Sequence, residues 1–274
     1  MASARRPTIG VFDSGFGGLT VLKALLGLIP EADYLYFGDT ARLPYGSKSV
    51  ETVGRYAVEA AHYLEGHGAQ VLVIACNTAT ALALDRIIAA ANVPVVGVVE
   101  PGAEAAAAVS KKKKVVVIGT EATVSSHAYR RALEAWGVET REKACPLLVP
   151  LVEEGWVEHP VTDQVAGIYL AEAFADGFHD ADALVLGCTH YPLLKGVLRK
   201  AAPEHVSIVD SAESTARVVA GRLQGLSASR EGEERREVPR IKFFATDSVE
   251  KFRRLGERFL GRAIENVEHV DLKE

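Results

Sequence analysis

The sequence predicts an α/β fold made of two similar α/β domains. Three observations support this: short apolar strands rich in β-branched residues recur along the chain, helical patterns follow most of them, and one strand-plus-cysteine motif occurs twice. Continuous apolar strands that alternate with helices are typical of parallel sheets buried on both faces. We therefore expect mostly parallel sheets with right-handed crossovers, and an active site in the cleft between the domains.

Eight strands are expected, and each ends close to a turn or a helical pattern. In chain order they are 8–12, 34–38, 71–75, 93–99, 115–119, 183–187, 206–210 and 241–246. Helical patterns are expected at 18–29, near 78–91, in an alanine-rich stretch after residue 99, and up to about Trp136. A short helix follows Pro192, and further helices follow the last two strands.

The repeated motif indicates how the chain is divided. VLVIACNT (71–78) and ALVLGCTH (183–190) share an apolar strand, a cysteine and a threonine close behind it. We expect a first domain of residues 1–98 plus 209–274 and a second of residues 99–208. Coincidence between common strand compositions is the alternative. The charged run at 230–240 is expected to be a solvated loop.

Composition narrows the function classes. At about 150 residues per domain, 274 residues fit roughly two domains. The hydrophobic share of 48% and the charged share of 24% are those of a globular protein, which excludes disordered, collagen-like and coiled-coil classes. The net charge of −5 leaves no domain-wide basic field, so no nucleic-acid partner is expected. Small acidic substrates remain possible.

Cysteine usage and hydropathy indicate a cytoplasmic protein. Three cysteines without a CxxC pair do not form a secreted disulfide framework. The basic N-terminal residues lack the apolar run of a signal peptide. The stretch 93–109 contains prolines and glutamates, so no membrane span is expected.

Polar side chains cluster where the expected strands end. In open α/β sheets, ligands bind beyond the carboxyl ends of the strands. Four groups lie at such ends: Asp13 with Ser14; Asp39; Cys76 with Asn77 and Thr78; and Cys188 with Thr189 and His190. If the two halves face each other, these groups converge on one cleft.

The segment DSGFGG, from Asp13 to Gly18, could bind an anion. Its glycines let the backbone approach a ligand, and a helix N-terminus follows. Thr20 stands where a dinucleotide fingerprint needs glycine, and no Walker sequence follows. The alternative is a tight strand–helix turn without a ligand.

Two of the three cysteines are candidates for chemistry. A free cysteine is usually a small buried hydrophobe, and Cys145, in ACPLLVPLV, is interpreted so. Cys76 and Cys188 instead have polar neighbours, and a helix N-terminus behind each would lower the pKa of its thiol. The pair suggests a thiolate and a thiol on opposite faces of a substrate. A metal site at Cys188–His190 is not favoured, because the other usual ligand spacings are absent.

Two further segments are candidates with ordinary alternatives. RLPYG (42–46) could form a rim that holds the substrate through Tyr45 and the backbone at Gly46, or it could be a plain turn. One of Glu153 and Glu154, in PLVEEG, could place a carboxylate near the second cysteine, or both could be exposed glutamates at a helix start.

Taken together, the motifs resemble those of glutamate racemases, in the cofactor-independent aspartate/glutamate racemase superfamily. The matching segments lie between residues 8 and 194: VFDSGFGGLTVL (11–22), GDTARLPYG (38–46), ACNTAT (75–80), PLVEEG (150–155) and GCTHYPLL (187–194). The resemblance implies two α/β domains, a homodimer, and conversion of L-glutamate to D-glutamate, a peptidoglycan precursor, without a cofactor.

The resemblance also implies residue roles. Cys76 and Cys188 would transfer the protons, and Asp13 and His190 would each assist the neighbouring thiol. Glu153 and Asp39 would be lesser participants. Substrate would be bound by Asp13, Ser14, Tyr45, Gly46, Asn77, Thr78, Thr189 and His190. No lysine lies at a strand-end cluster, which argues against a pyridoxal Schiff base.

Three alternatives remain open from the residues themselves. A related racemase could act on aspartate or another amino acid with the same cysteine pair. A non-catalytic binding module for amino acids would need neither thiol. A cysteine hydrolase would use a single nucleophile and accumulate an acyl-enzyme.

Overall fold

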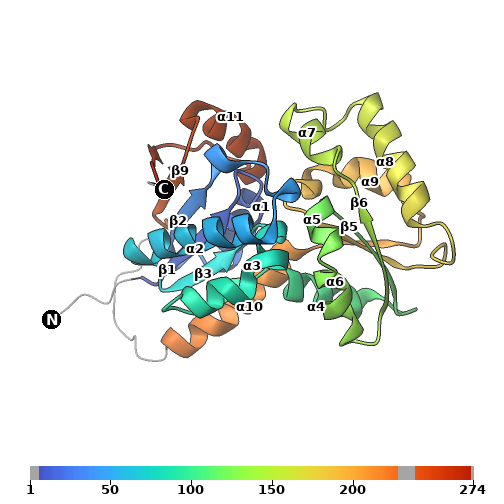
Figure 1. Cartoon of the computed structure of the whole chain (residues 1–274), viewed down its shortest axis with the longest axis horizontal. Helices are drawn as coiled ribbons and strands as arrows, with labels where there is room; N and C mark the ends of the chain where they lie inside the picture. The colour runs from blue at the N-terminus through green and yellow to red at the C-terminus, as the bar shows by residue number, and fades with distance from the viewer. Residues whose placement is uncertain (1–5, 228–237, 273–274) are drawn as a thin grey trace.

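The computed structural model describes residues 6–227 and 238–272, and it forms two α/β lobes side by side (Figure 1). The predicted fold class is confirmed. Most of the charged run at 230–240, up to residue 237, lies outside the described residues. Within the described ranges, no helix is long and apolar enough to cross a membrane.

Each lobe is built on one parallel sheet. The first sheet contains, in spatial order, β10 (Val267–His269), β9 (Ile241–Ala245), β2 (Asp33–Gly38), β1 (Thr8–Asp13), β3 (Val71–Ile74) and β4 (Val95–Gly97). The second contains β6 (Glu139–Ala144), β5 (Lys114–Gly119), β7 (Ala183–Gly187) and β8 (Ser207–Asp210).

The two sheets repeat one strand order. The order β2-β1-β3-β4 in the first sheet corresponds to β6-β5-β7-β8 in the second, so β3 and β7 occupy equivalent places. This agrees with the repeated motif in the sequence. The first sheet draws on residues 8–97 and 241–269, and the second on 114–210. We propose two domains that follow this division. The chain returns from the second domain to the first after Asp210, because β8 of the second sheet continues unbroken to that residue.

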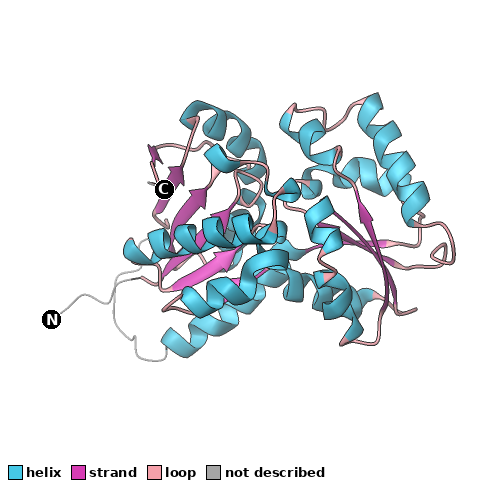
Figure 2. Ribbon diagram, in the orientation of Figure 1, coloured by secondary structure: helices cyan, strands magenta, loops and turns pink. Residues whose placement is uncertain are grey.

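Helices cover both faces of each sheet (Figure 2). They are α1 (Leu19–Leu28), α2 (Val50–Gly66), α3 (Asn77–Ala90), α4 (Val99–Val109), α5 (Glu121–Ser125), α6 (Ala128–Glu134), α7 (Leu148–Glu153), α8 (Pro160–Ala173), α9 (Lys195–Ala201), α10 (Ser211–Ser227) and α11 (Val249–Leu260). Short 3-10 turns occur at Thr40–Arg42, Tyr45–Ser47 and Tyr191–Leu194.

The apolar strands explain this layering. Successive side chains of a strand point to opposite faces of the sheet. On β3, Val71 and Val73 pack into the core on the side of α1, α10 and α11, whereas Leu72 and Ile74 pack against α2 and α3. The valines of β5 alternate in the same way, so each sheet is buried on both faces.

The lobes meet closely at the loop between β1 and α1. A Cβ atom on Gly17 would lie 2.7 Å from His190 Nδ1 and closer still to Thr189 Oγ1. Gly46 makes a second such contact, because its Cβ would lie 2.9 Å from Thr120 Cβ. Only glycine allows the backbone of the first lobe to approach the second lobe at these two points.

This contact gives a stability prediction. Gly17→Ala should lower the free energy of unfolding by about 1–3 kcal/mol, because the added methyl group overpacks the contact. Gly27→Ala is the matched control: Gly27 is an exposed position of helix α1, and its Cβ would meet nothing within 4 Å. The control should gain up to about 1 kcal/mol from better helix propensity. Urea denaturation measures both, and equal stabilities would contradict the packing argument.

Candidate active site

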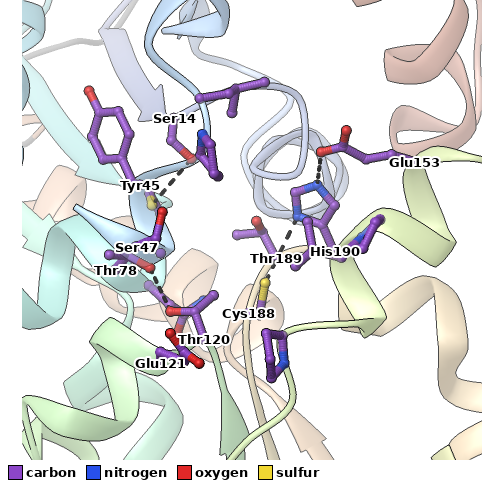
Figure 3. A pocket seen from close by; sticks show the side chains of 18 residues that line it. Ser14, Tyr45, Ser47, Thr78, Thr120, Glu121, Glu153, Cys188, Thr189 and His190 are labelled. Atoms are coloured by element: carbon purple, nitrogen blue, oxygen red, sulfur yellow. Dashed lines mark hydrogen bonds and ion pairs between the residues drawn. The ribbon is translucent and has the colours of Figure 1, made fainter. Parts of the chain in front are cut away.

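A cavity of about 200 Å³ lies between the carboxyl ends of the two sheets (Figure 3). It brings together most of the residues predicted from the sequence: Ser14, Tyr45, Gly46, Cys76, Asn77, Thr78, Glu153, Cys188, Thr189 and His190. Asp13 and Asp39 are not in its lining, and both are fully buried behind the wall.

The two cysteines reach this cavity from different lobes. Cys76 follows β3 in the first sheet and Cys188 follows β7 in the second. The thiol of Cys76 donates to Ser14 Oγ at 3.6 Å and accepts from the backbone N–H of Ala79 at 3.4 Å. The charge of Cys188 is among the causes that raise the pKa of Cys76, so the two sulfurs are electrostatically coupled.

The Cys76 thiol is held in its neutral form. Burial, and then the negative charge of Asp13, raise its pKa to about 12, although the Ala79 N–H and the Ser14 hydroxyl act against this. The sequence-based expectation of a low pKa at this helix N-terminus is therefore wrong. The loss of hydration outweighs the stabilisation from one N–H group and the helix dipole.

The carboxyl group of Asp13, which acts electrostatically on Cys76, also favours its own protonated form. Burial raises the pKa of its carboxyl, although the charge on His190 and hydrogen bonds from backbone N–H groups lower it. Its Oδ2 accepts from the Gly15 N–H at 2.9 Å, and no hydrogen-bond partner reaches Oδ1 within the described chain. Asp13 can therefore exchange a proton on the first-lobe side.

Cys188 has a basic group, His190, as its neighbour, whereas Cys76 has an acidic one, Asp13. Its Sγ lies 3.9 Å from His190 Nδ1, and His190 Nε2 lies 3.3 Å from Glu153 Oε1. Burial lowers the pKa of His190, but Cys188 and Glu153 together raise it to about 10. An imidazolium at this distance stabilises a negatively charged sulfur.

The chain of charges continues across the lobe boundary. Lys251 on α11 lies with its Nζ 3.8 Å from Glu153 Oε2. Burial opposes ionisation of Glu153, yet His190 and Lys251 lower its net pKa. Glu153 is therefore an anion between two cations, and it lies near the second cysteine as the sequence suggested.

The Tyr45 hydroxyl does not face the cavity. It donates to Asp39 Oδ2 at 2.5 Å, on the side of the ring away from the cavity (Figure 3). Asp39 also accepts from Arg42 Nε at 2.7 Å and Thr246 Oγ1 at 2.9 Å. The expected rim is present, but the ring and the backbone at Gly46 form it, and Asp39 holds this loop from behind.

Several lining residues were missed from the sequence. They come from the loops and helices around α5 and α7: Ser47, Thr120, Glu121, Pro146, Val149 and Pro150. Thr120 follows β5 as Ser14 follows β1, and its Oγ1 lies 3.0 Å from Thr78 Oγ1 across the lobes. The repeat could have identified Thr120, whereas the others depend on tertiary packing. No group of three or more metal-ligating side chains occurs within residues 6–227 and 238–272.

Comparison with known proteins assigns the family. The model of the Asp/Glu/hydantoin racemase family matches residues 20–219. The chain belongs to this racemase family. It is 62% identical to the glutamate racemase of Koribacter versatilis, over 98% of this chain and 99% of that relative.

Solved structures of other racemases share its fold. A glutamate racemase isoform of Bacillus anthracis superposes with a TM-score of 0.89 at 38% identity, covering 97% of this chain and 98% of that one. A Francisella tularensis glutamate racemase solved in complex with D-glutamate gives 0.88 at 34% identity, with the same coverage.

The ion pair between His190 and Glu153 gives a prediction about titration. Because Glu153 raises the pKa of His190, Glu153→Gln should lower it, and the imidazolium should then lose its proton at a lower pH than in the wild type. The wild-type ring should titrate near pH 10 in an NMR titration. Glu154→Gln, at the exposed neighbouring glutamate, is the control and should leave the titration in place. An unchanged His190 titration in Glu153→Gln would refute this coupling.

Proposed function

We propose that this member of the racemase family interconverts L- and D-glutamate by a two-base proton transfer at the α-carbon. The observation that carries the proposal is that two cysteines, one from each lobe, line one small cavity, each beside its own acid–base group. Relatives named as glutamate racemases, which match nearly the whole chain, support glutamate as the substrate.

The reaction needs groups of this kind. The α-proton of an amino acid is a very weak acid, so its removal requires a placed base, stabilisation of the developing charge and exclusion of water. One sulfur, as thiolate, takes the α-proton and leaves a carbanion. The opposite thiol then gives a proton to the other face, which inverts the carbon and leaves that sulfur as the new thiolate.

The environments of the two sulfurs suggest the starting protonation state. Because His190 Nδ1 lies beside Cys188 Sγ, we assign the thiolate of the starting state to Cys188, whereas burial and Asp13 keep Cys76 as a thiol. In this state, Cys188 removes a proton and Cys76 donates one. For the opposite enantiomer, Asp13 would accept the Cys76 proton, and His190 would supply a proton to Cys188.

Neutral donors would bind the substrate carboxylates. The first backbone N–H groups of α3, at Asn77 and Thr78, have no partner inside the helix. The hydroxyls of Ser14 and Thr189 line the same cavity. Such donors orient the carboxylates through directional hydrogen bonds, and they add no charge of their own to the cavity.

The biological setting is part of the same proposal. D-glutamate made by the enzyme would supply peptidoglycan synthesis, and the enzyme would act as a cytoplasmic homodimer without a cofactor. These points rest on the resemblance of the five motifs to those of glutamate racemases. Cytoplasmic location also fits the low number of cysteines.

Cysteine substitutions test the proposal. Cys76→Ser and Cys188→Ser should each lower the racemisation rate by about 10²–10⁴-fold in both directions, because a serine hydroxyl is a far weaker acid than a thiol. Cys145→Ser is the matched control: this cysteine is equally buried but does not line the cavity. Polarimetry with L- and D-glutamate, without added cofactor, measures all three variants.

The outcome separates the alternatives. A cysteine hydrolase would depend on one cavity cysteine only, and a binding module would turn over nothing. Full activity in either cavity variant would end the two-base proposal. Higher activity on aspartate than on glutamate would show that aspartate is the substrate, and the two-base mechanism would still hold.

A further inference from the structure

We propose that Tyr129 is a positioning residue for substrate recognition: it fixes the Asn77 amide so that its N–H groups face a substrate carboxylate. This inference rests on the proposed function. Tyr129 is on α6 in the second lobe, and its hydroxyl donates to Asn77 Oδ1 at 2.7 Å. Asn77 begins α3 in the first lobe, directly after Cys76, and lines the cavity.

The hydrogen bond determines which end of the amide is free. With Oδ1 accepting from Tyr129, Nδ2 is the remaining polar atom of the side chain. No hydrogen bond of Nδ2 to an acceptor occurs in the described parts of the chain, and Asn77 lines the cavity. An amide in the reverse orientation would present its oxygen to an anionic substrate and repel it. With the Tyr129 hydroxyl donating to Oδ1, the amide has the orientation that can donate to a carboxylate.

Tyr129 itself is held rigidly. Its side chain is fully buried, and burial raises the pKa of its hydroxyl, so the hydroxyl keeps its proton and can donate it. The ring packs beside Gly187, where a Cβ would lie 3.1 Å from the ring edge. The Ser211 side chain lies beside the hydroxyl. Since Gly187 precedes Cys188, Tyr129 contacts the residue next to each cysteine.

The start of α6 is also fixed, on the side of the helix that faces β6. The buried carboxylate of Glu142 pairs with His127 Nδ1 at 2.7 Å and with Arg130 Nε at 3.6 Å. These two residues flank Tyr129 in the chain and anchor the turn that carries it. A tyrosine held in this way can orient a neighbouring amide at little cost in conformational entropy.

The test removes only the hydroxyl. Tyr129→Phe should raise the KM for L- and D-glutamate by about three- to tenfold, with kcat within about twofold of the wild type, because a neutral hydrogen bond that orients a donor is lost. Tyr34→Phe is the matched control: its buried hydroxyl donates to Leu25 O and Ile29 O, far from the cavity lining. It should lose similar stability and keep the wild-type KM.

A double-mutant cycle shows whether Tyr129 acts through Asn77. In an Asn77→Ala background, Tyr129→Phe should have no further effect on KM. Additive effects, or an unchanged KM in Tyr129→Phe alone, would overturn the inference. Absence of glutamate turnover in the wild type would instead overturn the proposed function.

A measurement on the wild-type protein covers the case in which Tyr129→Phe does not fold. The side-chain N–H₂ resonances of Asn77 are assigned by their loss in Asn77→Ala. They should shift when glutamate is added, because they face its carboxylate. Resonances that stay in place at saturating glutamate would contradict the proposed orientation.

Discussion

The close approach of the Gly17 backbone to Thr189 and His190 is the contact on which the rest of the cavity depends. It brings the carboxyl end of the first sheet against that of the second, at a distance that no side chain would allow. Two further contacts hold the lobes together nearby. The hydroxyls of Thr78 and Thr120 form a hydrogen bond, and the backbone at Gly46 packs against Thr120. Each lobe supplies one cysteine after an equivalent strand, so this boundary sets how the two sulfurs face a ligand.

The strand order is repeated, but the chemistry at the two strand ends is not. Cys76 is buried beside a carboxyl group, and both conditions favour its neutral thiol. Cys188 lies beside the imidazole of His190, whose pKa is raised by Cys188 itself and by Glu153. Lys251, from the other lobe, pairs with Glu153 and extends this chain of charges. The proposed two-base mechanism needs one thiolate and one thiol at a time, and such different surroundings of the two sulfurs suit that need.

The sequence predicts the features that follow from local pattern. Apolar strands buried on both faces, the repeated cysteine motif and the strand-end position of His190 all depend on short segments, and the structure contains them. Edge strand β6 (Glu139–Ala144) lacks an apolar run, since its side chains are only partly buried, and it was missed for that reason. The direction of the Tyr45 hydroxyl and the raised pKa of Cys76 depend on long-range burial, which local pattern does not encode.

The most direct test of the account is turnover of each glutamate enantiomer in deuterated water without added cofactor. In the proposed mechanism, the two thiols lie on opposite sides of the α-carbon and exchange their protons with solvent, so the donor sulfur carries deuterium when it protonates the opposite face. The account predicts that the product of each turnover carries solvent deuterium at the α-position, in both directions, as measured by mass spectrometry and NMR. Product that retains the substrate's own α-protium would contradict proton transfer between two separate groups.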